Sequence, residues 1–386
     1  EAGESLVVTD PKGELCADLA RWLEQRGYTV RVFNLADPAR SHRWNPVAEC
    51  RDEEEVTALA MTVVVNAAKE KSGYFLMKET QLLEALVFLL NADFPEEHRH
   101  LRAALSLCAW PQEELGARFE RAYRAGRLPL AGYERWKGAV ASNYDNAVSG
   151  LTAKLKVICT APVAALLSEH ELDLADVGRR KTALFCVLPV GGGHLRPVLA
   201  AFYWFLFRRL RQAAEENGGR LPVPVRFLLD EFANIGQVPG FPEVISTARG
   251  QGVMIQFVLQ GLRQLDDVYG AADAENILAN CPVRLLLGCN DVATARYFSA
   301  MLGEAAVQSV SERQDVSTPL SGMGLPKRTL TTVRRALMEP EELMRLKAEH
   351  AVAVVQGCLP MFLEKLGWDE LPQAREVKAA GQASPA

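Results

Sequence analysis

The chain has 386 residues, of which 49% are hydrophobic and 24% charged, a composition that excludes a disordered or fibrous protein. Lys and Arg number 43 against 48 Asp and Glu, and the net charge of −5 argues against a protein coated by nucleic acid, although a local basic patch or a basic ring in an oligomer would escape this sum. The eight cysteines form no CxxC pair, which argues against a disulfide scaffold or a zinc site and fits a reducing cytoplasm.

The N-terminal residues predict a βαβ unit. An apolar run at residues 5–9 ends at Asp10-Pro11, where Asp as N-cap and Pro in the first turn favour the start of a helix. This helix is expected to end at Gly27, and a second apolar run follows at residues 29–35. Strand, helix and strand within about 30 residues predict a parallel sheet. Lys12 can reach a phosphate at the carboxyl end of the first strand, whereas capping alone explains Asp10.

The next part of the chain is expected to be all-α. Residues 51–167 show helical periodicity throughout, and Pro or Gly separates the segments. The longest apolar runs of the chain, residues 82–90 and 197–207, are well short of the ~20 residues that a bilayer-spanning helix needs.

Strands and helices alternate again after this segment. Apolar runs at 182–189, 225–229, 253–259, 283–287 and 351–355 bring the expected strands to at least seven, and continuous apolar runs are typical of strands covered on both faces. Residues 311–332 are polar and rich in Pro and Gly, which predicts a mobile loop, and residues 373–386 predict a disordered tail. The expected fold is an α/β domain in two parts, 1–50 and 168–372, interrupted by an all-α domain at 51–167.

Two adjacent carboxylates follow one of the predicted strands. Asp230 and Glu231 come directly after the apolar run at 225–229, and ligands of open parallel sheets bind at the carboxyl ends of strands. The first acid can hold a magnesium ion and the second can polarise an attacking water, as nucleotide hydrolysis requires. A pair that only caps the following helix explains the pattern equally well.

Two further polar residues lie near predicted strand or helix ends. Gln260 follows the next strand, where a neutral amide can bond a γ-phosphate, although polar residues are common at strand ends. Arg249 lies at the end of a predicted helix and can act as an arginine finger on a neighbouring subunit. Favourable placement of a cation at a helix C-terminus is an equal explanation for Arg249.

The phosphate-binding motif GxxxxGK[ST] occurs nowhere in the 386 residues. A chain with a carboxylate pair after a strand but without this loop cannot bind ATP by itself in the usual way.

Several runs, in a specific order, resemble the coupling ATPases of conjugation and type IV secretion. The resemblance extends from Ser5 to about Phe362. The matching runs are residues 7–15 (VVTDPKGEL), 41–46 (SHRWNP), 228–236 (LLDEFANIG), 260–270 (QGLRQLDDVYG), 280–288 (NCPVRLLLG) and 334–343 (RRALMEPEEL).

The resemblance implies a RecA-like P-loop NTPase fold interrupted by an all-α domain, in a hexameric motor anchored in the bacterial inner membrane and facing the cytoplasm. It implies that Asp230 and Glu231 are the Walker B pair, with Asp230 on Mg²⁺ through water, that Gln260 senses the γ-phosphate and that Arg249 acts in trans. ATP and Mg²⁺ are expected between subunits. The implied partners are single-stranded DNA, relaxase or effector proteins, other secretion-system ATPases and channel subunits.

The front of the chain departs from the family pattern. In the family, transmembrane helices and the phosphate-binding loop precede the strand that matches residues 5–9. We therefore expect a fragment that begins after that loop and is impaired in hydrolysis.

Three interpretations stay open. The first is an ATP-driven motor, and the second is a non-enzymatic receptor whose helical domain docks substrates. A septal or archaeal DNA-pumping ATPase is the third, and the run at 232–236 together with the helical insertion argues against it.

Overall fold

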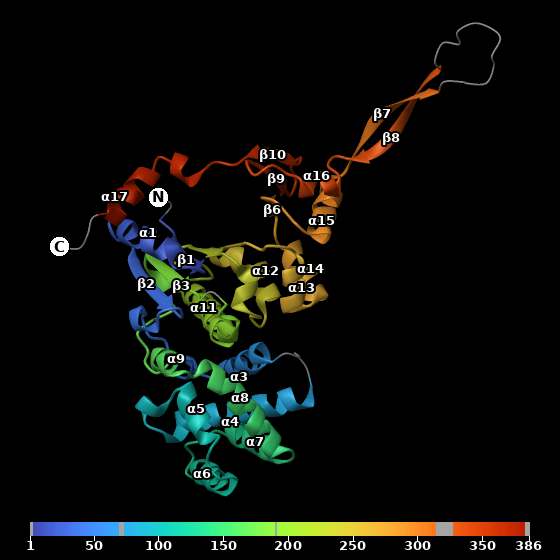
Figure 1. The fold of residues 1–386 in the computed structure, drawn as a ribbon. Coiled ribbons are helices and arrows are strands. Elements are labelled where there is room, and N and C mark those ends of the chain that lie inside the picture. Colours follow the sequence, from blue (N-terminus) through green and yellow to red (C-terminus); the bar gives the residue numbers. More distant parts are fainter. Residues whose placement is uncertain (1–2, 69–72, 190, 314–326, 383–386) are drawn as a thin grey trace, which may run out of the picture. The chain divides into compact units, whose positions relative to one another are not determined.

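A computed structural model describes residues 3–68, 73–189, 191–313 and 327–382. The chain divides into two compact units (Figure 1). The first contains Glu1–Leu259 and Pro372–Ala386, and the second contains Gln260–Leu371.

The first unit is built on a five-stranded parallel sheet in the order β2-β3-β1-β4-β5. All six residues of β3 are buried, which agrees with its continuous apolar run. The strands are β1 (Ser5–Asp10), β2 (Thr29–Asn34), β3 (Thr182–Val187), β4 (Val225–Leu229) and β5 (Val253–Phe257).

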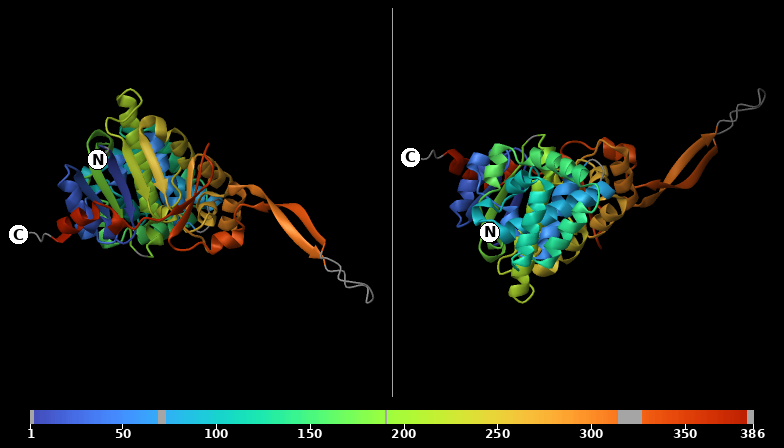
Figure 2. Two further views of the ribbon diagram at one scale, coloured as in Figure 1. Left: turned by 90° about the horizontal axis from the view of Figure 1, so that it is seen from above. Right: turned by 90° about the horizontal axis from the view of Figure 1, so that it is seen from below.

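Helices cover both faces of this sheet (Figure 2). Aromatic side chains of α11 (Arg196–Glu216) cross one face, where Phe202 stacks on Phe33 of β2 and Phe207 stacks on Phe227 of β4. The other face packs Val8 and Phe185 against α1 (Glu14–Glu24). Since alternate residues of a strand point to opposite faces, the apolar runs supply both layers. Helices α10 (Asp176–Arg179) and α12 (Phe241–Gln251) and the short turns η1 (Pro38–Arg40), η3 (Gly193–Leu195) and η4 (Phe232–Ile235) complete this part.

Helices fill the described part of residues 46–166, and they lie together below the sheet in Figure 1. The long helix α4 is buried from Leu82 to Leu90, so this apolar run is the centre of a helical bundle. Among the described residues, no helix combines the length and the apolar character that a membrane crossing needs. The elements are α2 (Pro46–Glu49), α3 (Glu53–Ala67), α4 (Tyr74–Asp93), η2 (Glu96–His98), α5 (Leu101–Leu107), α6 (Gln112–Arg124), α7 (Leu130–Val140), α8 (Tyr144–Ile158) and α9 (Ala161–Leu166).

The second unit has its own small core, in which Leu286, Phe298 and Leu343 are buried together. Two of the seven expected strands, β6 (Val283–Leu286) and β9 (His350–Val355), lie here in an antiparallel sheet of order β10-β9-β6 and do not extend the parallel one. The other elements are α13 (Arg263–Tyr269), α14 (Ala271–Ala279), α15 (Val292–Leu302), α16 (Pro340–Met344), β10 (Met361–Glu364) and η5 (Trp368–Glu370).

The prediction of a loop at residues 311–332 is wrong at both ends of this range, where the chain forms strands. Strands β7 (Glu304–Arg313) and β8 (Lys327–Ala336) pair along their whole length as a ribbon that projects from the second unit (Figure 2). Residues 314–326 lie outside the described residues. The sequence did not indicate this ribbon, because its few apolar residues are exposed and are separated by polar ones; they include Val307 and Val310 in β7 and Leu330 and Val333 in β8.

The disordered tail expected at 373–386 is also corrected. Helix α17 (Ala374–Gln382) packs against α1. Arg26 pairs with Glu376, and Ala374 and Val377 are buried. The low apolar content of this segment concealed a short amphipathic helix, which needs only one buried stripe.

Candidate functional site

The carboxylate pair lies at the carboxyl end of β4, a strand that is flanked by β1 and β5. Leu229 is buried, and the chain leaves the sheet at Asp230, which is half-buried. The backbone N–H of Glu231 donates to Oδ1 of Asp230 at 3.0 Å. Both carboxylates therefore stand at the edge of the sheet where ligands of parallel sheets bind.

Glu231 has an unusual backbone conformation. Its φ of 48° and ψ of 49° are left-handed, and among the described residues only Asn143 is another non-glycine with positive φ. Such a conformation costs about 1–3 kcal/mol and persists where neighbours impose it. Here Asn234 imposes it, because its N–H donates to Glu231 O at 2.8 Å and its Nδ2 donates to Oε2 at 2.5 Å. The buried Phe232 donates to Val258 O at 3.1 Å and fixes the other side.

Strand β5 ends beside β4, as the sequence predicted. The N–H of Val258 donates to Leu229 O at 2.9 Å, two residues before Gln260. Gln260 itself begins the second unit, where its N–H donates to Oε1 of Gln264 at 2.9 Å.

Arg249 is exposed near the end of α12. This helix ends beside the first residue of β4, because Val225 N–H donates to Gly252 O at 3.0 Å. Five residues of strand, at about 3.3 Å each, separate that edge of the sheet from Asp230. Within one chain the structure therefore does not bring Arg249 to the carboxylates.

Asp10 and Lys12 lie at the carboxyl end of β1, next to β4 in the sheet. Asp10 is buried, and its two carboxylate oxygens accept from the N–H groups of Gly13 at 2.9 Å and Cys16 at 2.7 Å. The expected N-cap position of Asp10 is wrong, because α1 begins at Glu14 with Gly13 as its N-cap. Asp10 instead shapes the loop before α1 and binds the N–H of Cys16 in the first turn of the helix. Burial, and after it the charge of Asp10, raise the pKa of Cys16 to about 11. Lys12 is exposed.

Asn66, in the last turn of α3, also belongs to this region, although no sequence pattern indicates it. Its side chain binds the backbone of Gln237, directly after Gly236 in the segment that follows Glu231. An isolated Asn within a helical period carries no signal of such a contact.

The residues at this edge fit a magnesium ion only together with a nucleotide. Among the described residues, no group of three or more His, Cys, Asp or Glu side chains is placed to hold a metal. Mg²⁺ commonly takes one or two carboxylates and completes its shell with water and phosphate oxygens. Asp230 supplies such a carboxylate, while a GxxxxGK[ST] loop is absent from the 386 residues.

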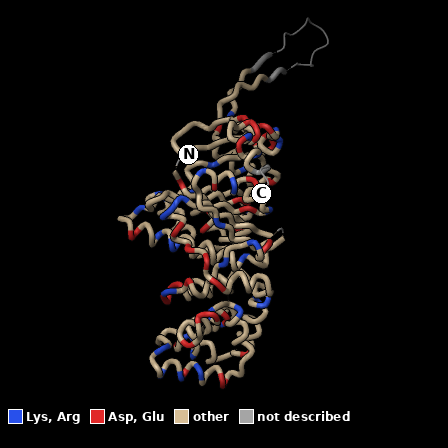
Figure 3. The backbone as a smooth tube through the Cα atoms, turned by 90° about the vertical axis from the view of Figure 1, so that its left-hand side faces the viewer, with Lys and Arg blue, Asp and Glu red and all other residues tan. Residues whose placement is uncertain are grey.

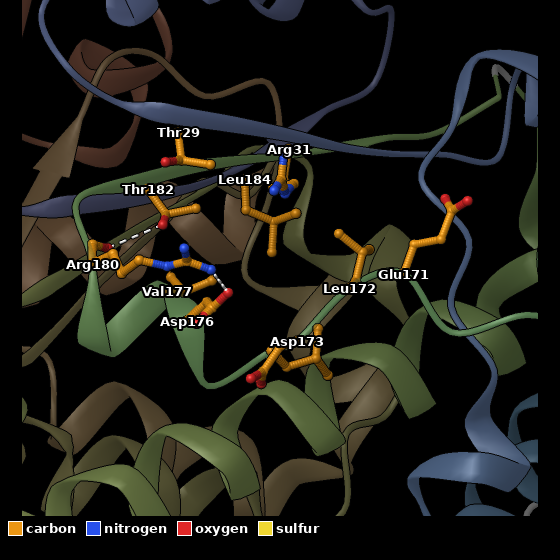
Figure 4. A pocket seen from close by; sticks show the side chains of 11 residues that line it. Thr29, Arg31, Glu171, Leu172, Asp173, Asp176, Val177, Arg180, Thr182 and Leu184 are labelled. Atoms are coloured by element: carbon orange, nitrogen blue, oxygen red, sulfur yellow. Dashed lines mark hydrogen bonds and ion pairs between the residues drawn. The ribbon is translucent and has the colours of Figure 1, made fainter.

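A pocket of about 150 Å³ lies at the other edge of the sheet, where β2 and β3 begin at Thr29 and Thr182 (Figure 4). Arg180 pairs with Asp176 there, and the hydroxyl of Thr182 donates to Arg180 O at 3.0 Å. This pocket is separate from the carboxylate pair, which stands at the carboxyl ends of the strands.

Charges of both signs are interspersed along the backbone (Figure 3). Several arginines are also paired with carboxylates, as Arg118 and Arg127 are with Asp93. This agrees with the net charge of −5.

Comparison with known proteins identifies the family of this chain. The family model described as "Type IV secretory system Conjugative DNA transfer" matches residues 1–383. The chain belongs to this family. The resemblance noted in the sequence is thereby confirmed.

Curated relatives match almost the whole chain at low identity. Protein VirD4 of Rhizobium rhizogenes is 24% identical over 381 residues, which cover 94% of this chain and 54% of the relative. Conjugal transfer protein TraG of Rhizobium radiobacter is 23% identical and is covered to 58%. The chain thus spans little more than half the length of these relatives.

A solved structure confirms the expected fold class, a RecA-like parallel sheet flanked by helices. The plasmid coupling protein TrwB in complex with ADP and Mg²⁺ matches with a TM-score of 0.64 and 17% identity. The match covers 96% of this chain and 87% of that one.

Proposed function

We propose that this chain is part of a coupling ATPase of a type IV secretion or conjugation system. The protein recruits relaxase-bound DNA or effector proteins and drives their transfer by ATP hydrolysis. The observation that supports this best is the carboxylate pair at the end of β4, with Glu231 held in a left-handed conformation by Asn234.

Each carboxylate has a separate task in this proposal. Asp230 holds Mg²⁺, through water, and the ion neutralises charge on the phosphates. Glu231 accepts the proton of the attacking water as general base, and its fixed backbone keeps the carboxylate aimed at one place. Gln260 bonds the γ-phosphate, and Lys12 and Asp10 border the nucleotide at the end of β1.

The nucleotide site is completed by parts from outside these 386 residues. A phosphate-binding loop from the longer protein cradles ATP, and Arg249 of one subunit reaches the nucleotide of its neighbour in a homo-hexamer. This arrangement accounts for the exposure of Arg249 and for its place away from Asp230 within one chain. The longer protein is held at the cytoplasmic face of the bacterial inner membrane by an N-terminal anchor.

The partners follow from the same proposal. They are single-stranded DNA, relaxase or effector proteins, other ATPases of the secretion system and its channel subunits. The helices at residues 51–167 take part in recognising the substrate.

The proposal is tested by ATP hydrolysis, measured with and without single-stranded DNA. The chain is compared with a longer version that contains the phosphate-binding loop, with its Glu231→Gln variant, and with Glu243→Gln as a control for an exposed glutamate of α12. We expect turnover only in the longer protein. Glu231→Gln should abolish this turnover, and the control Glu243→Gln should leave it unchanged. A longer hexameric protein that is inert would refute the motor and favour a non-enzymatic docking receptor.

A further inference from the structure

One side chain of the helical segment binds the segment that follows the carboxylate pair. Nδ2 of Asn66 donates to Gln237 O at 2.9 Å, and Gln237 N–H donates to Oδ1 of Asn66 at 2.7 Å. The second N–H of the amide donates to Thr62 O of the same helix at 2.9 Å. The side chain of Asn66 thus takes both backbone polar groups of Gln237, as a neighbouring strand would.

The orientation of the Asn66 amide follows from its partners. Gln237 offers one donor and one acceptor, and Thr62 offers an acceptor. Rotating the amide by 180° would set an N–H against an N–H and oxygen against both carbonyls. Only one orientation satisfies all three bonds, so the contact is specific.

Gly236 permits this close approach. Its φ is +89°, and a Cβ at this position would lie 2.5 Å from Oδ1 of Asn66 and 3.2 Å from Cβ of Arg196. A side chain at 236 would therefore be strained in its backbone and would push the end of α3 away. The loop and α3 are fitted to each other at two successive residues.

A short segment with buried side chains joins this contact to Glu231. The turn η4 lies between them, with Phe232 and Ile235 buried in the core. Asn234 of the same turn holds the Glu231 carboxylate. The turn that joins Gln237 to Glu231 is thus anchored in the core at both of its ends.

The other end of α3 is fixed to the sheet domain by buried ion pairs. Arg209 of α11 contacts Glu55 in the first turn of α3 and Glu49 of α2, and all three side chains are buried. Helix α3 also packs along α4, the central helix of the bundle. It is therefore the element through which the helical segment touches both α11 and the loop after Glu231.

We propose that Asn66 is a positioning residue that couples the helical segment to the carboxylate pair. A displacement of α3 alters the Asn66–Gln237 bonds and, through η4, the position of the Glu231 carboxylate. The inference rests on the proposed function only for its effect on hydrolysis, since the coupling of α3 to the loop is a property of the chain itself.

The coupling is tested first in the 386-residue chain by amide hydrogen exchange. Asn66→Ala removes both bonds to Gln237, and we expect protection at residues 231–237 to fall about tenfold or more, because two hydrogen bonds are lost. The control is Asn91→Ala, which removes the same side chain and one longer bond, from Nδ2 of Asn91 to Val47 O at 3.4 Å, elsewhere in the helical segment. Gly236→Ala should in turn reduce protection in the last turn of α3, because coupling is reciprocal.

The effect on chemistry is tested in the longer protein that contains the phosphate-binding loop. We expect Asn66→Ala to lower kcat about 10- to 100-fold while KM stays unchanged, since the carboxylate is misplaced and nucleotide contacts are intact. Asn91→Ala should leave both unchanged. If the longer wild-type protein is inert, the proposed function fails, and hydrogen exchange still decides the coupling. Equal exchange at residues 231–237 in Asn66→Ala and Asn91→Ala would overturn the inference.

Discussion

The buried ion pairs around Arg209 give the largest stability effect that we expect from one substitution. The guanidinium lies 2.9 Å from Oε2 of Glu49 and donates to both oxygens of Glu55, at 2.5 and 3.0 Å. The exposed fractions are 2% for Arg209, 2% for Glu49 and 0% for Glu55. Arg209→Ala removes the cation and leaves two carboxylates in the interior. Breaking a buried pair in this way costs about 3–5 kcal/mol.

The remaining neighbours place the effect near the lower end of that range. Arg208 lies 3.6 Å from Glu55, which also accepts from the N–H of Arg51 at 2.9 Å. His170 lies 3.5 Å from Glu49, which also accepts from Nε1 of Trp44 at 3.3 Å, so each carboxylate keeps partners. The free energy of unfolding of the first unit is measured from the urea dependence of hydrogen exchange in α3 and α11. Arg211→Ala, which removes an exposed pair with Glu215 on the same helix, should change it very little.

The loss should also depend on pH. Burial alone would raise the pKa of Glu55, but the hydrogen bonds and charge of Arg209 outweigh it and hold this pKa below its ordinary value. In the native protein this stabilisation is present above the unfolded pKa and is lost as pH falls through the folded one. In Arg209→Ala only the N–H of Arg51 and the charge of Arg208 still oppose burial, so the pKa of Glu55 rises and acid relieves part of the defect. A loss below about 1 kcal/mol, or one that is equal at pH 5 and pH 7.5, would refute this reasoning.

Three further outcomes are expected. Asp52→Ala removes the N-cap of α3, so the free energy of unfolding of the first unit should fall by about 1 kcal/mol. A lower urea midpoint would show this loss. Gly132→Ala places a Cβ 2.7 Å from Cβ of Phe88, so α7 and α4 become overpacked. The free energy of unfolding should fall by about 1–3 kcal/mol, which a lower melting temperature would show. A thiol reagent at pH 8, followed by mass spectrometry, should label exposed Cys358 and leave Cys186 intact, because burial raises the pKa of Cys186 to about 12.

The parallel sheet could be predicted because its signals are local. The strands β1 to β5 are short runs rich in apolar residues, and a helical period follows β1, although the helix begins at Glu14 and not at the expected Asp10-Pro11 step. The place of Asp230 and Glu231 then follows from chain direction alone, since a residue after a parallel strand lies at its carboxyl edge.

What could not be predicted depends on contacts between distant parts of the chain. The run at 283–287 resembled a strand covered on both faces, yet Val283 and Leu285 are 61% and 51% exposed, and only Leu286 is buried. Composition alone does not show which apolar face finds a neighbour. The contact of Asn66 with Gln237 joins residues 171 positions apart, and the left-handed conformation of Glu231 is set by Asn234 and by neighbouring strands.

The two ends of α3 allow these contacts to be tested together. Glu55 and Asn66 are 11 residues apart, which is about 17 Å along a helix at 1.5 Å per residue. If α3 moves as one rigid element, Arg209→Ala should reduce hydrogen-exchange protection at Gln237, although Arg209 is bonded only near the start of α3. In Arg209→Ala combined with Asn66→Ala the two losses should then be less than additive, because the second substitution acts on a loop already released. Fully additive losses would mean that the two ends of α3 yield independently, and the helix would then transmit nothing to Glu231.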